Sequence, residues 1–223
     1  MSQIHPTPDL HGRPVLLYRW AVFLLAGAAT VKQIAIDGDY SDPGGPFRFL
    51  TNWALLLAFL NASRMLAFSE RRSERQWPDL TAVACVANLL MAGLYWALRF
   101  DDPANLRDGP ELPAYLDLYL HLFGPLLLWI DAVFIARGFR RPWRSAPWIL
   151  VLVALYVAWI ELVVGPASDV PFGSVTSGLP YPFLNNMAVE ARAILYGGIA
   201  AAGMAALALF AGLSYAVSGR NRA

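Results

Sequence analysis

The sequence predicts an all-α membrane protein, a polytopic bundle of six transmembrane helices with both termini in the cytoplasm. Three observations support this prediction. Of the 223 residues, 57% are hydrophobic and 15% are charged, a balance outside the usual range of soluble proteins. Six apolar stretches each approach the ~20 residues that a helix needs to cross the hydrocarbon core of a bilayer. The loops between these stretches alternate between basic and acidic.

The six predicted helices cover residues 14–36, 48–68, 79–99, 115–136, 146–165 and 191–217. Pro14, Pro78 and Pro147 stand near three of the helix starts, where a residue without an N–H costs little. The connections contain turn-forming clusters such as "DGDYSDPGGP" and "DDPANLRDGPELP". Because no internal repeat is visible, we expect one membrane domain over 14–217, with a cytoplasmic segment over 1–13 and a cytoplasmic tail over 218–223.

The charges of the loops predict how the bundle is oriented. Basic residues gather in the N-terminal segment, the second and fourth loops and the tail: Arg13, Arg19, Arg64, Arg71, Arg72, Arg75, Arg137, Arg140, Arg141, Arg144, Arg220 and Arg222. The other loops are acidic: Asp37, Asp39, Asp42, Asp101, Asp102, Asp108, Glu111, Asp117, Asp169 and Glu190. Since positively charged loops stay in the cytoplasm, both termini are predicted inside and the acidic loops outside.

The composition also excludes several classes of function. The net charge is only +1 and no basic face is visible, so we expect no nucleic-acid partner. Cys85 is the only cysteine, which leaves no internal disulfide and no cysteine metal cluster. The three histidines, His5, His11 and His121, are scattered along the chain, so we expect no metal and no cofactor.

Ionisable residues inside the predicted spans are candidates for function, because a charge in lipid is costly. They are Lys32, His121, Asp131 and Glu161. For Asp131 and Glu161 we favour pairing with flanking arginines, Arg137 in the case of Asp131, over a catalytic role. Lys32 can equally extend toward the outer headgroups. The amides of Asn61 and Asn88 are expected to make hydrogen bonds between helices.

Thr51 and His121 form the pair with the clearest chemical meaning. Both are predicted a few residues into helices that enter from outside, at a depth of roughly 5–10 Å at ~1.5 Å per residue. A hydroxyl beside an imidazole is the minimum for covalent acyl transfer, since the imidazole takes the hydroxyl proton. Asp117 lies one turn before His121 and would orient its ring. The alternative is structural, because threonine hydroxyls in membrane helices often bond a preceding carbonyl.

Three stretches carry a resemblance to a known family: "GGPFRFLT" (44–51), "HLFGPLLLWID" (121–131) and "YPFL" (181–184). In this order they resemble the androgen-induced protein family of multi-pass membrane hydrolases, which has many bacterial relatives. Lys32 and Trp96, the latter ahead of "LRFDD", also match positions of the family pattern. One departure is "YLDLYLH", which lacks a second histidine and an asparagine found before the catalytic histidine in mammalian members, and leaves the orienting partner of His121 open.

The resemblance implies a hydrolase of lipid esters, such as fatty acid esters of hydroxy fatty acids, in the inner membrane of a bacterium. Thr51 would be the nucleophile and His121 the general base. Its substrate would be a lipid inside the bilayer, and its other partners membrane lipids; the sequence leaves the oligomeric state open.

Further residues would support that site. Lys32 or Arg48 would pair with the substrate head group, although Arg48 equally suits an interfacial anchor, and Asn52 or helix amides would stabilise the oxyanion. Tyr181 and Phe183 would cover the pocket or simply turn the chain. A non-enzymatic protein that binds or transports a small lipid or solute is the alternative, although no pair of broken helices is visible.

Overall fold

Helices account for the long apolar segments, because in lipid the backbone N–H and C=O groups of a segment must be satisfied within it. The computed structural model describes residues 8–102, 106, 112–139, 141–168 and 178–219, and in this part of the chain it contains helices and no strand. Several of the charged loop residues used above, Asp108, Glu111, Arg140, Asp169, Arg220 and Arg222, lie outside the described residues, as do parts of the two terminal segments.

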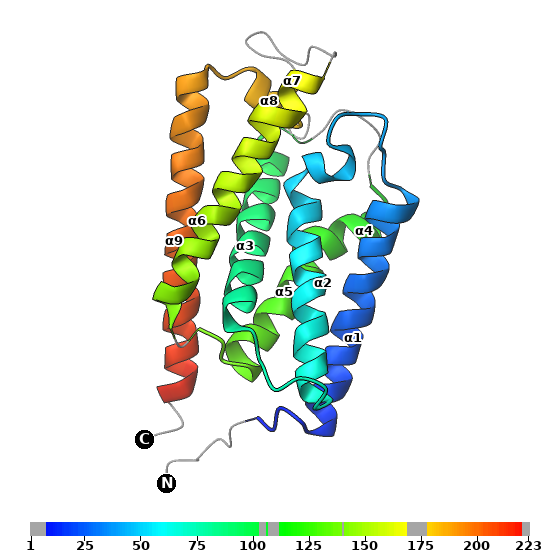
Figure 1. Cartoon of the computed structure of the whole chain (residues 1–223), viewed down its shortest axis with the longest axis vertical. Helices are drawn as coiled ribbons and strands as arrows, with labels where there is room; N and C mark the ends of the chain where they lie inside the picture. Colours follow the sequence, from blue (N-terminus) through cyan, green and yellow to red (C-terminus); the bar gives the residue numbers. More distant parts are fainter. Residues whose placement is uncertain (1–7, 103–105, 107–111, 140, 169–177, 220–223) are drawn as a thin grey trace.

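Six long helical runs follow one another (Figure 1). They are α1 (Arg13–Thr30, extended to Ile36), α2 (Leu50–Ser69), α3 (Pro78–Asp101), α4 (Ala114–Leu118) continuing through α5 (Gly124–Ile130) to Ile135, α6 (Pro142–Trp159) continuing into α7 (Gly165–Ala167), and α9 (Val189–Gly219). Two short helices, a 3-10 turn at Gly45–Arg48 and α8 at Pro182–Asn185, lie in the connections. The predicted ends are correct to within four residues.

Five of the six runs are long and apolar enough to cross a membrane, and these helices make the chain an integral membrane protein. Helix α2 is not among them, since it contains Thr51, Asn52, Asn61 and Arg64. It nevertheless packs between α1 and α3 in the same bundle. The sixth span therefore stays a prediction, which the position of α2 supports.

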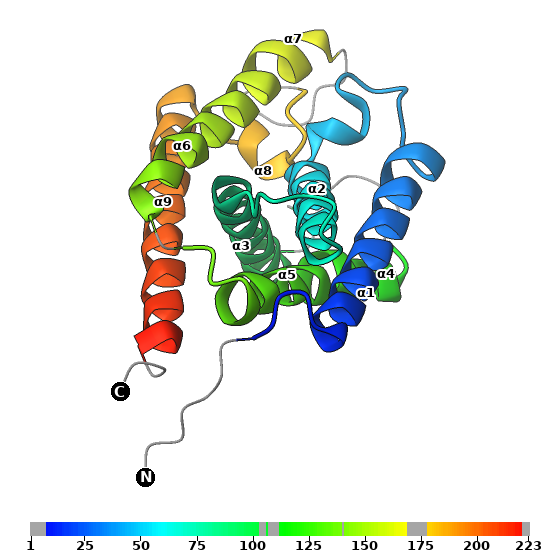
Figure 2. The same cartoon turned by 60° about the horizontal axis from the view of Figure 1, so that its bottom comes forward.

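Helix α3 lies at the centre of the bundle and contacts α2, α5, α6 and α9 (Figure 2). Every residue from Thr81 to Asn88 is buried, so this stretch has no face toward lipid. Ala82, Ala84 and Ala87 are small, which lets the neighbouring backbones approach closely. The predicted amide bonds between helices are confirmed: Asn88 Nδ2 donates to the Ala54 carbonyl at 3.0 Å, and Asn61 Oδ1 accepts from the Thr81 hydroxyl at 2.7 Å.

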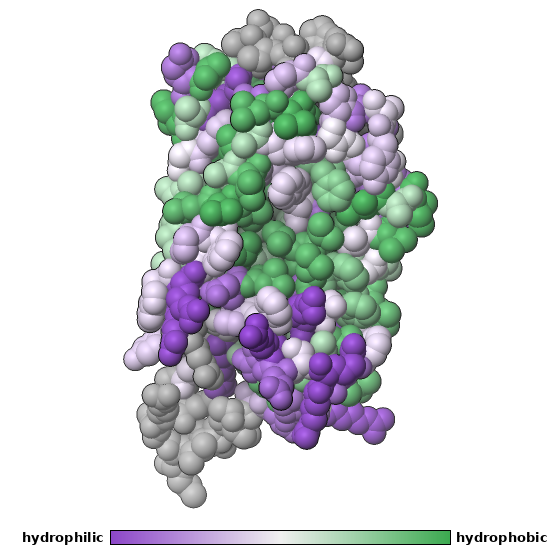
Figure 3. Space-filling model, viewed as in Figure 1, coloured by the Kyte–Doolittle hydropathy of each residue, from purple (hydrophilic) through white to green (hydrophobic). Residues whose placement is uncertain are grey.

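The described chain begins and ends at the same end of the bundle, which we call the terminal end; α2 begins at the opposite end, the cavity end (Figure 1). Apolar side chains cover the middle of the face shown in Figure 3, and hydrophilic ones gather toward its terminal end. This distribution suits a bundle that spans a bilayer. Which end faces the cytoplasm stays a prediction from the loop charges.

All four of the ionisable residues singled out inside the spans lie in π-helical turns. Lys32 lies in Val31–Ile36, His121 in Tyr119–Phe123, Asp131 in Asp131–Ile135 and Glu161 in Ile160–Val164. A π turn inserts one extra residue into a helix and redirects its side chains, and such turns are frequent at functional sites. Here they turn the polar groups toward partners on other helices.

The structure corrects three sequence-based expectations. Asp131 does not pair with Arg137 but with Arg19 of α1, whose Nη2 lies 2.8 Å from its Oδ1. The partner of Glu161 is Arg192 of α9, at 2.8 Å, rather than an arginine next to it in the sequence. Pro147 lies inside α6, which begins earlier, at Pro142. Both ion pairs join residues far apart in the chain, which local spacing cannot show.

Candidate active site

The loop before α2 fixes where the helix begins. Gly44 and Gly45 have φ angles of 81° and 52°, in the left-handed region that favours glycine. A Cβ on Gly44 would also lie 2.7 Å from Val164 Cγ2. The turn that follows is clamped at the carbonyl of Phe47, which accepts the indole N–H groups of Trp53 at 2.7 Å and Trp159 at 3.1 Å. Thr51 is thereby placed in the first turn of α2.

Tyr181, in the connection between α7 and α9, also fixes the start of α2. Its hydroxyl accepts the backbone N–H of Leu50 at 3.0 Å, and its ring meets that of Phe49 edge to face. Burial raises the pKa of the Tyr181 phenol above its ordinary value, so the group stays neutral. The "YPFL" motif thus supports the position of Thr51 from a distant part of the chain.

Thr51 and His121 lie together although 70 residues separate them. Thr51 Oγ1 is 3.4 Å from His121 Nε2. This is longer than the ~2.6–3.2 Å of a working base and its proton donor, as is common where no substrate is bound. The histidine is 4% exposed, whereas Thr51 is partly exposed.

Asp117 orients the histidine. His121 Nδ1 lies 3.0 Å from Asp117 Oδ1 and 3.0 Å from the backbone carbonyl of Asp117. Both partners are acceptors, so Nδ1 carries the proton and Nε2 is left as an acceptor. Nε2 is the nitrogen that faces Thr51. The order threonine, histidine, aspartate is that of a hydrolase triad.

Tyr95 of α3 joins this arrangement, and the sequence analysis missed it. Its ring stacks on the imidazole of His121, with centroids 3.5 Å apart and planes 6° apart. Its hydroxyl donates to Asp117 Oδ2 at 2.6 Å. Tyr95 thus holds both the base and the carboxylate. The sequence feature that could have pointed to Tyr95 is that it directly precedes Trp96, a position matched by the family pattern.

Trp96 and Pro125 set the backbone under His121. Pro125 has no N–H, so it cannot bond the carbonyl four residues earlier, which belongs to His121. The indole N–H of Trp96 donates to that carbonyl at 3.0 Å instead. The π turn, the proline and the tryptophan together fix the depth and direction of the histidine.

Thr51 lines a large cavity, the main cavity, of about 930 Å³, within the size range of ligand sites. Its lining comprises Gln33, Asp37, Gly38, Asp39, Gly45, Pro46, Arg48, Phe49, Leu50, Thr51, Asn52, Met91, Leu94, Tyr95, Trp96, Leu98, Arg99, Leu106, Leu112, Ala114, Asp117, Leu118, His121 and Tyr181. The cavity therefore reaches all three residues of the triad.

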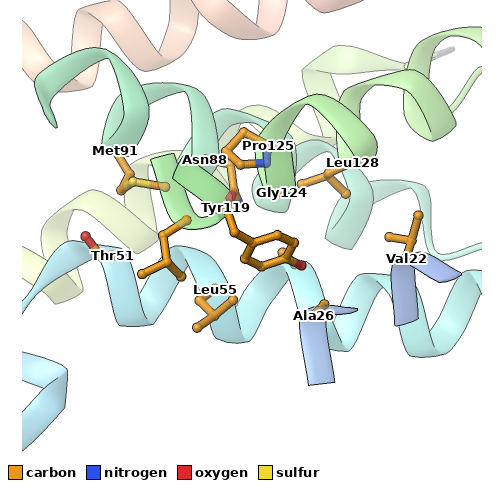
Figure 4. Close-up of a pocket in the computed structure, with 12 residues that line it drawn as sticks. Val22, Ala26, Thr51, Leu55, Asn88, Met91, Tyr119, Gly124, Pro125 and Leu128 are labelled. Atoms are coloured by element: carbon orange, nitrogen blue, oxygen red, sulfur yellow. The ribbon is translucent and has the colours of Figure 1, made fainter. Parts of the chain in front are cut away.

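A second space, the narrow channel, leads from Thr51 toward the middle of the bundle (Figure 4). Its volume is about 20 Å³, room for one or two water-sized groups. The lining is Val22, Ala26, Thr51, Leu55, Ala58, Asn88, Met91, Tyr119, Leu120, Gly124, Pro125 and Leu128. Figure 4 shows Thr51 at one end and Val22 at the other.

The remaining candidate residues are placed as follows. Lys32 forms an ion pair with Asp37 at 2.7 Å, and Arg48 pairs with Asp42 while lying over the Phe49 ring. Asn52 is 6% exposed, and its Nδ2 donates to the Pro46 carbonyl at 2.7 Å. Phe183 does not line the main cavity, but its ring packs against that of Tyr181, which does. The described residues contain no group of three His, Cys, Asp or Glu side chains that could hold a metal ion.

The fold and the site define a helical integral membrane protein with a hydroxyl, an imidazole and a carboxylate in contact at one end of its bundle. Residues 15–214 match the FAR-17a/AIG1-like protein family, and the chain belongs to this family. The resemblance found in the sequence is thereby confirmed at the level of the family, whereas membership of a bacterial branch stays a prediction. Comparison with curated proteins and with solved structures gives no match.

Proposed function

We propose that the protein is an intramembrane hydrolase of lipid esters, with Thr51 as nucleophile and His121 as general base. The observation that carries this proposal is the 3.4 Å approach of Thr51 Oγ1 to His121 Nε2, the ring nitrogen opposite the one that Asp117 holds. The main cavity beside them supports it, because it gives a substrate access to the hydroxyl. Family membership agrees with the proposal but does not test the chemistry.

The reaction proceeds in two halves. Thr51 Oγ1 attacks the ester carbonyl carbon while its proton moves to His121 Nε2, and the carbonyl oxygen becomes an oxyanion. The C–O bond to the alcohol then breaks, the alcohol leaves with the proton from His121, and the acyl group remains on Thr51. Water next attacks the acyl carbon, with His121 again taking and returning a proton, and the fatty acid is released.

The start of α2 supplies the stabilisation of the oxyanion. Amides in the first turn of a helix have no acceptor within it, and the helix dipole adds positive potential there. Leu50 N–H donates to Tyr181 and Asn52 N–H to the Phe49 carbonyl, which leaves the N–H of Thr51 without an acceptor among the described residues. In our proposal this amide binds the oxyanion, and Asn52 serves to hold the Pro46 loop.

Thr51 lines both spaces, an arrangement that suits a lipid ester with two arms. In the proposed complex the narrow channel holds only the one or two acyl carbons next to the ester, and the rest of the substrate, including the alcohol part, lies in the main cavity. Fatty acid esters of hydroxy fatty acids, the class implied by the family resemblance, have this form. We further propose that the substrate enters from the bilayer, and that the protein resides in the inner membrane of a bacterium.

Covalent labelling tests the nucleophile. The purified protein in detergent is expected to react with a fluorophosphonate probe, and Thr51→Ala is expected to abolish the labelling, because the hydroxyl that faces His121 Nε2 is gone. Thr51→Ser keeps a hydroxyl and should retain labelling. The matched control is Thr30→Ala, since the Thr30 hydroxyl only donates to the Ala26 carbonyl. Labelling that persists in Thr51→Ala would rule out this nucleophile and favour a protein that binds or transports a lipid or solute.

The narrow channel predicts a preference in acyl-chain length. Leu120 is 3% exposed and lines the channel, so Leu120→Ala should widen it and raise kcat/KM for long-chain relative to short-chain acyl esters by about 10-fold or more. Leu116→Ala is the matched control, since Leu116 lies in the same apolar cluster but lines neither space. A series of nitrophenyl esters of increasing acyl length measures the ratio. An unchanged ratio in Leu120→Ala would place the acyl chain elsewhere.

A further inference from the structure

The cations around the main cavity differ in whether they have partners. Lys32 does not line the cavity and is paired with Asp37, which does, and Arg48 in the cavity wall is paired with Asp42. Both head-group candidates from the sequence are therefore already neutralised. Arg99 also lines the cavity, and within the described part of the chain it makes no ion pair or hydrogen bond.

Arg99 lies in line with the catalytic residues. It follows Tyr95 by four residues in α3, so the two share a helix face. Tyr95 stacks on His121, and Arg99 is one turn, ~6 Å along the helix axis, closer to the cavity end. A group bound at Arg99 would thus lie several bonds from an ester carbonyl at Thr51, on the side of the main cavity.

Gln33 of α1 adds a second donor to the same cavity. Its side-chain amide likewise has no hydrogen-bond partner among the residues that the structure describes, and both Gln33 and Arg99 are partly buried. A partly buried guanidinium without an anionic partner is less well solvated than one at the surface, so an anion bound beside it is favoured. Its planar set of donors fits a carboxylate or a phosphate through two parallel hydrogen bonds.

We propose that Arg99, assisted by Gln33, binds an anionic group, a carboxylate or a phosphate, on the alcohol part of the substrate. This inference rests on the proposed function for the place of the ester. It assigns Arg99 the selection of anionic over neutral lipids, whereas Thr51 and His121 carry out the reaction.

The experiment compares substrates that differ only in this charge. Three esters share one acyl group and one alcohol chain, which ends in a carboxylate, its methyl ester or a phosphate. With the purified full-length protein in detergent, Arg99→Gln is expected to raise KM for the preferred anionic ester by about 10- to 100-fold, the loss of a charge-assisted hydrogen bond. The KM for the methyl ester should change by less than about 2-fold. For the anionic ester, the KM of Arg99→Lys should lie between those of the wild type and Arg99→Gln. Arg64→Gln, at an exposed arginine of α2, is the matched control and should change none of the three KM values.

A binding measurement keeps the inference separate from catalysis. Titration calorimetry with a hydroxy fatty acid, its methyl ester and a long-chain alkyl phosphate requires no turnover. Arg99→Gln is expected to weaken binding of the carboxylate or the phosphate about 10-fold or more, and the larger loss identifies the anion. Equal affinity of wild type and Arg99→Gln for both anions overturns the inference. If the wild-type protein binds these anions but hydrolyses none of the three esters, the proposed hydrolysis is overturned instead.

Discussion

Replacing His121 by alanine is expected to lower kcat for ester hydrolysis by about 10³-fold, within the range that a general base contributes. The reason is positional. Nε2 of His121 faces the Thr51 hydroxyl, and the opposite nitrogen is held by Asp117, so Nε2 is placed to accept the proton of the hydroxyl. Without the ring, Thr51 remains protonated and is a poor nucleophile. Initial rates on a nitrophenyl ester measure the effect.

Two controls separate the base from the fold. His11→Ala removes the other described histidine, which lies against the Ser69 carbonyl at the terminal end of the bundle, and should leave kcat unchanged. Asp117→Asn keeps the size of the side chain but offers Nδ1 a donor, which moves the ring proton to Nε2 and should lower kcat strongly with little change in KM. Turnover in His121→Ala close to that of wild type would exclude the base assignment.

The helices and the depth of the candidate site could be predicted from the sequence for a simple reason. A membrane helix can be recognised in the sequence by the length of an apolar run. The fixed rise per residue then gives the depth of each residue along the helix. Thr51 and His121 are both near the start of a helix that begins at the cavity end. Counting residues from each helix start was therefore enough to predict that they lie at the same depth in the bundle. Their contact also requires that α2 lie beside the α4–α5 run, which the structure supplies.

The partners of the charged groups could not be predicted in the same way. Rotation of each helix about its axis decides which side chains meet, and π turns change that rotation locally. Tyr95 is an ordinary aromatic residue in the sequence, and only the packing of α3 on the α4–α5 run places its ring on His121. Lys32 and Arg48 are different, because their partners Asp37 and Asp42 lie five and six residues away and were visible in the same loop.

The buried ion pair between Arg19 and Asp131 leads to the largest expected effect on stability. Arg19 is 1% exposed and donates to Asp131 at 2.8 Å, to the Ser69 hydroxyl at 2.8 Å and to the Met65 carbonyl at 3.1 Å. One guanidinium therefore ties α1 to α2 and to the end of the α4–α5 run. Asp131→Ala leaves that cation buried without its carboxylate, which should destabilise the bundle by about 3–5 kcal/mol.

Thermal unfolding of the purified protein in detergent measures this loss. Asp131→Ala and Arg19→Ala should both unfold at clearly lower temperatures than wild type. Arg64→Ala is the matched arginine control, because Arg64 is exposed, lies over the Trp77 ring and should cost no more than about 1 kcal/mol. Asp131→Ala that unfolds like wild type would show that the ion pair does not hold the helices together.

A double variant distinguishes the role of the charges from that of packing. Arg19→Met with Asp131→Leu removes both charges and fills the space with apolar side chains, a change that in buried pairs is often neutral or stabilising. We expect it to recover most of the stability lost in Asp131→Ala, since no uncompensated charge remains. Arg19 lies in the second turn of α1, which begins at the terminal end, whereas Thr51 lies in the first turn of α2, which begins at the cavity end, so the double variant should also hydrolyse esters at the wild-type rate. Recovered stability with lost hydrolysis would instead connect the buried pair to the candidate active site.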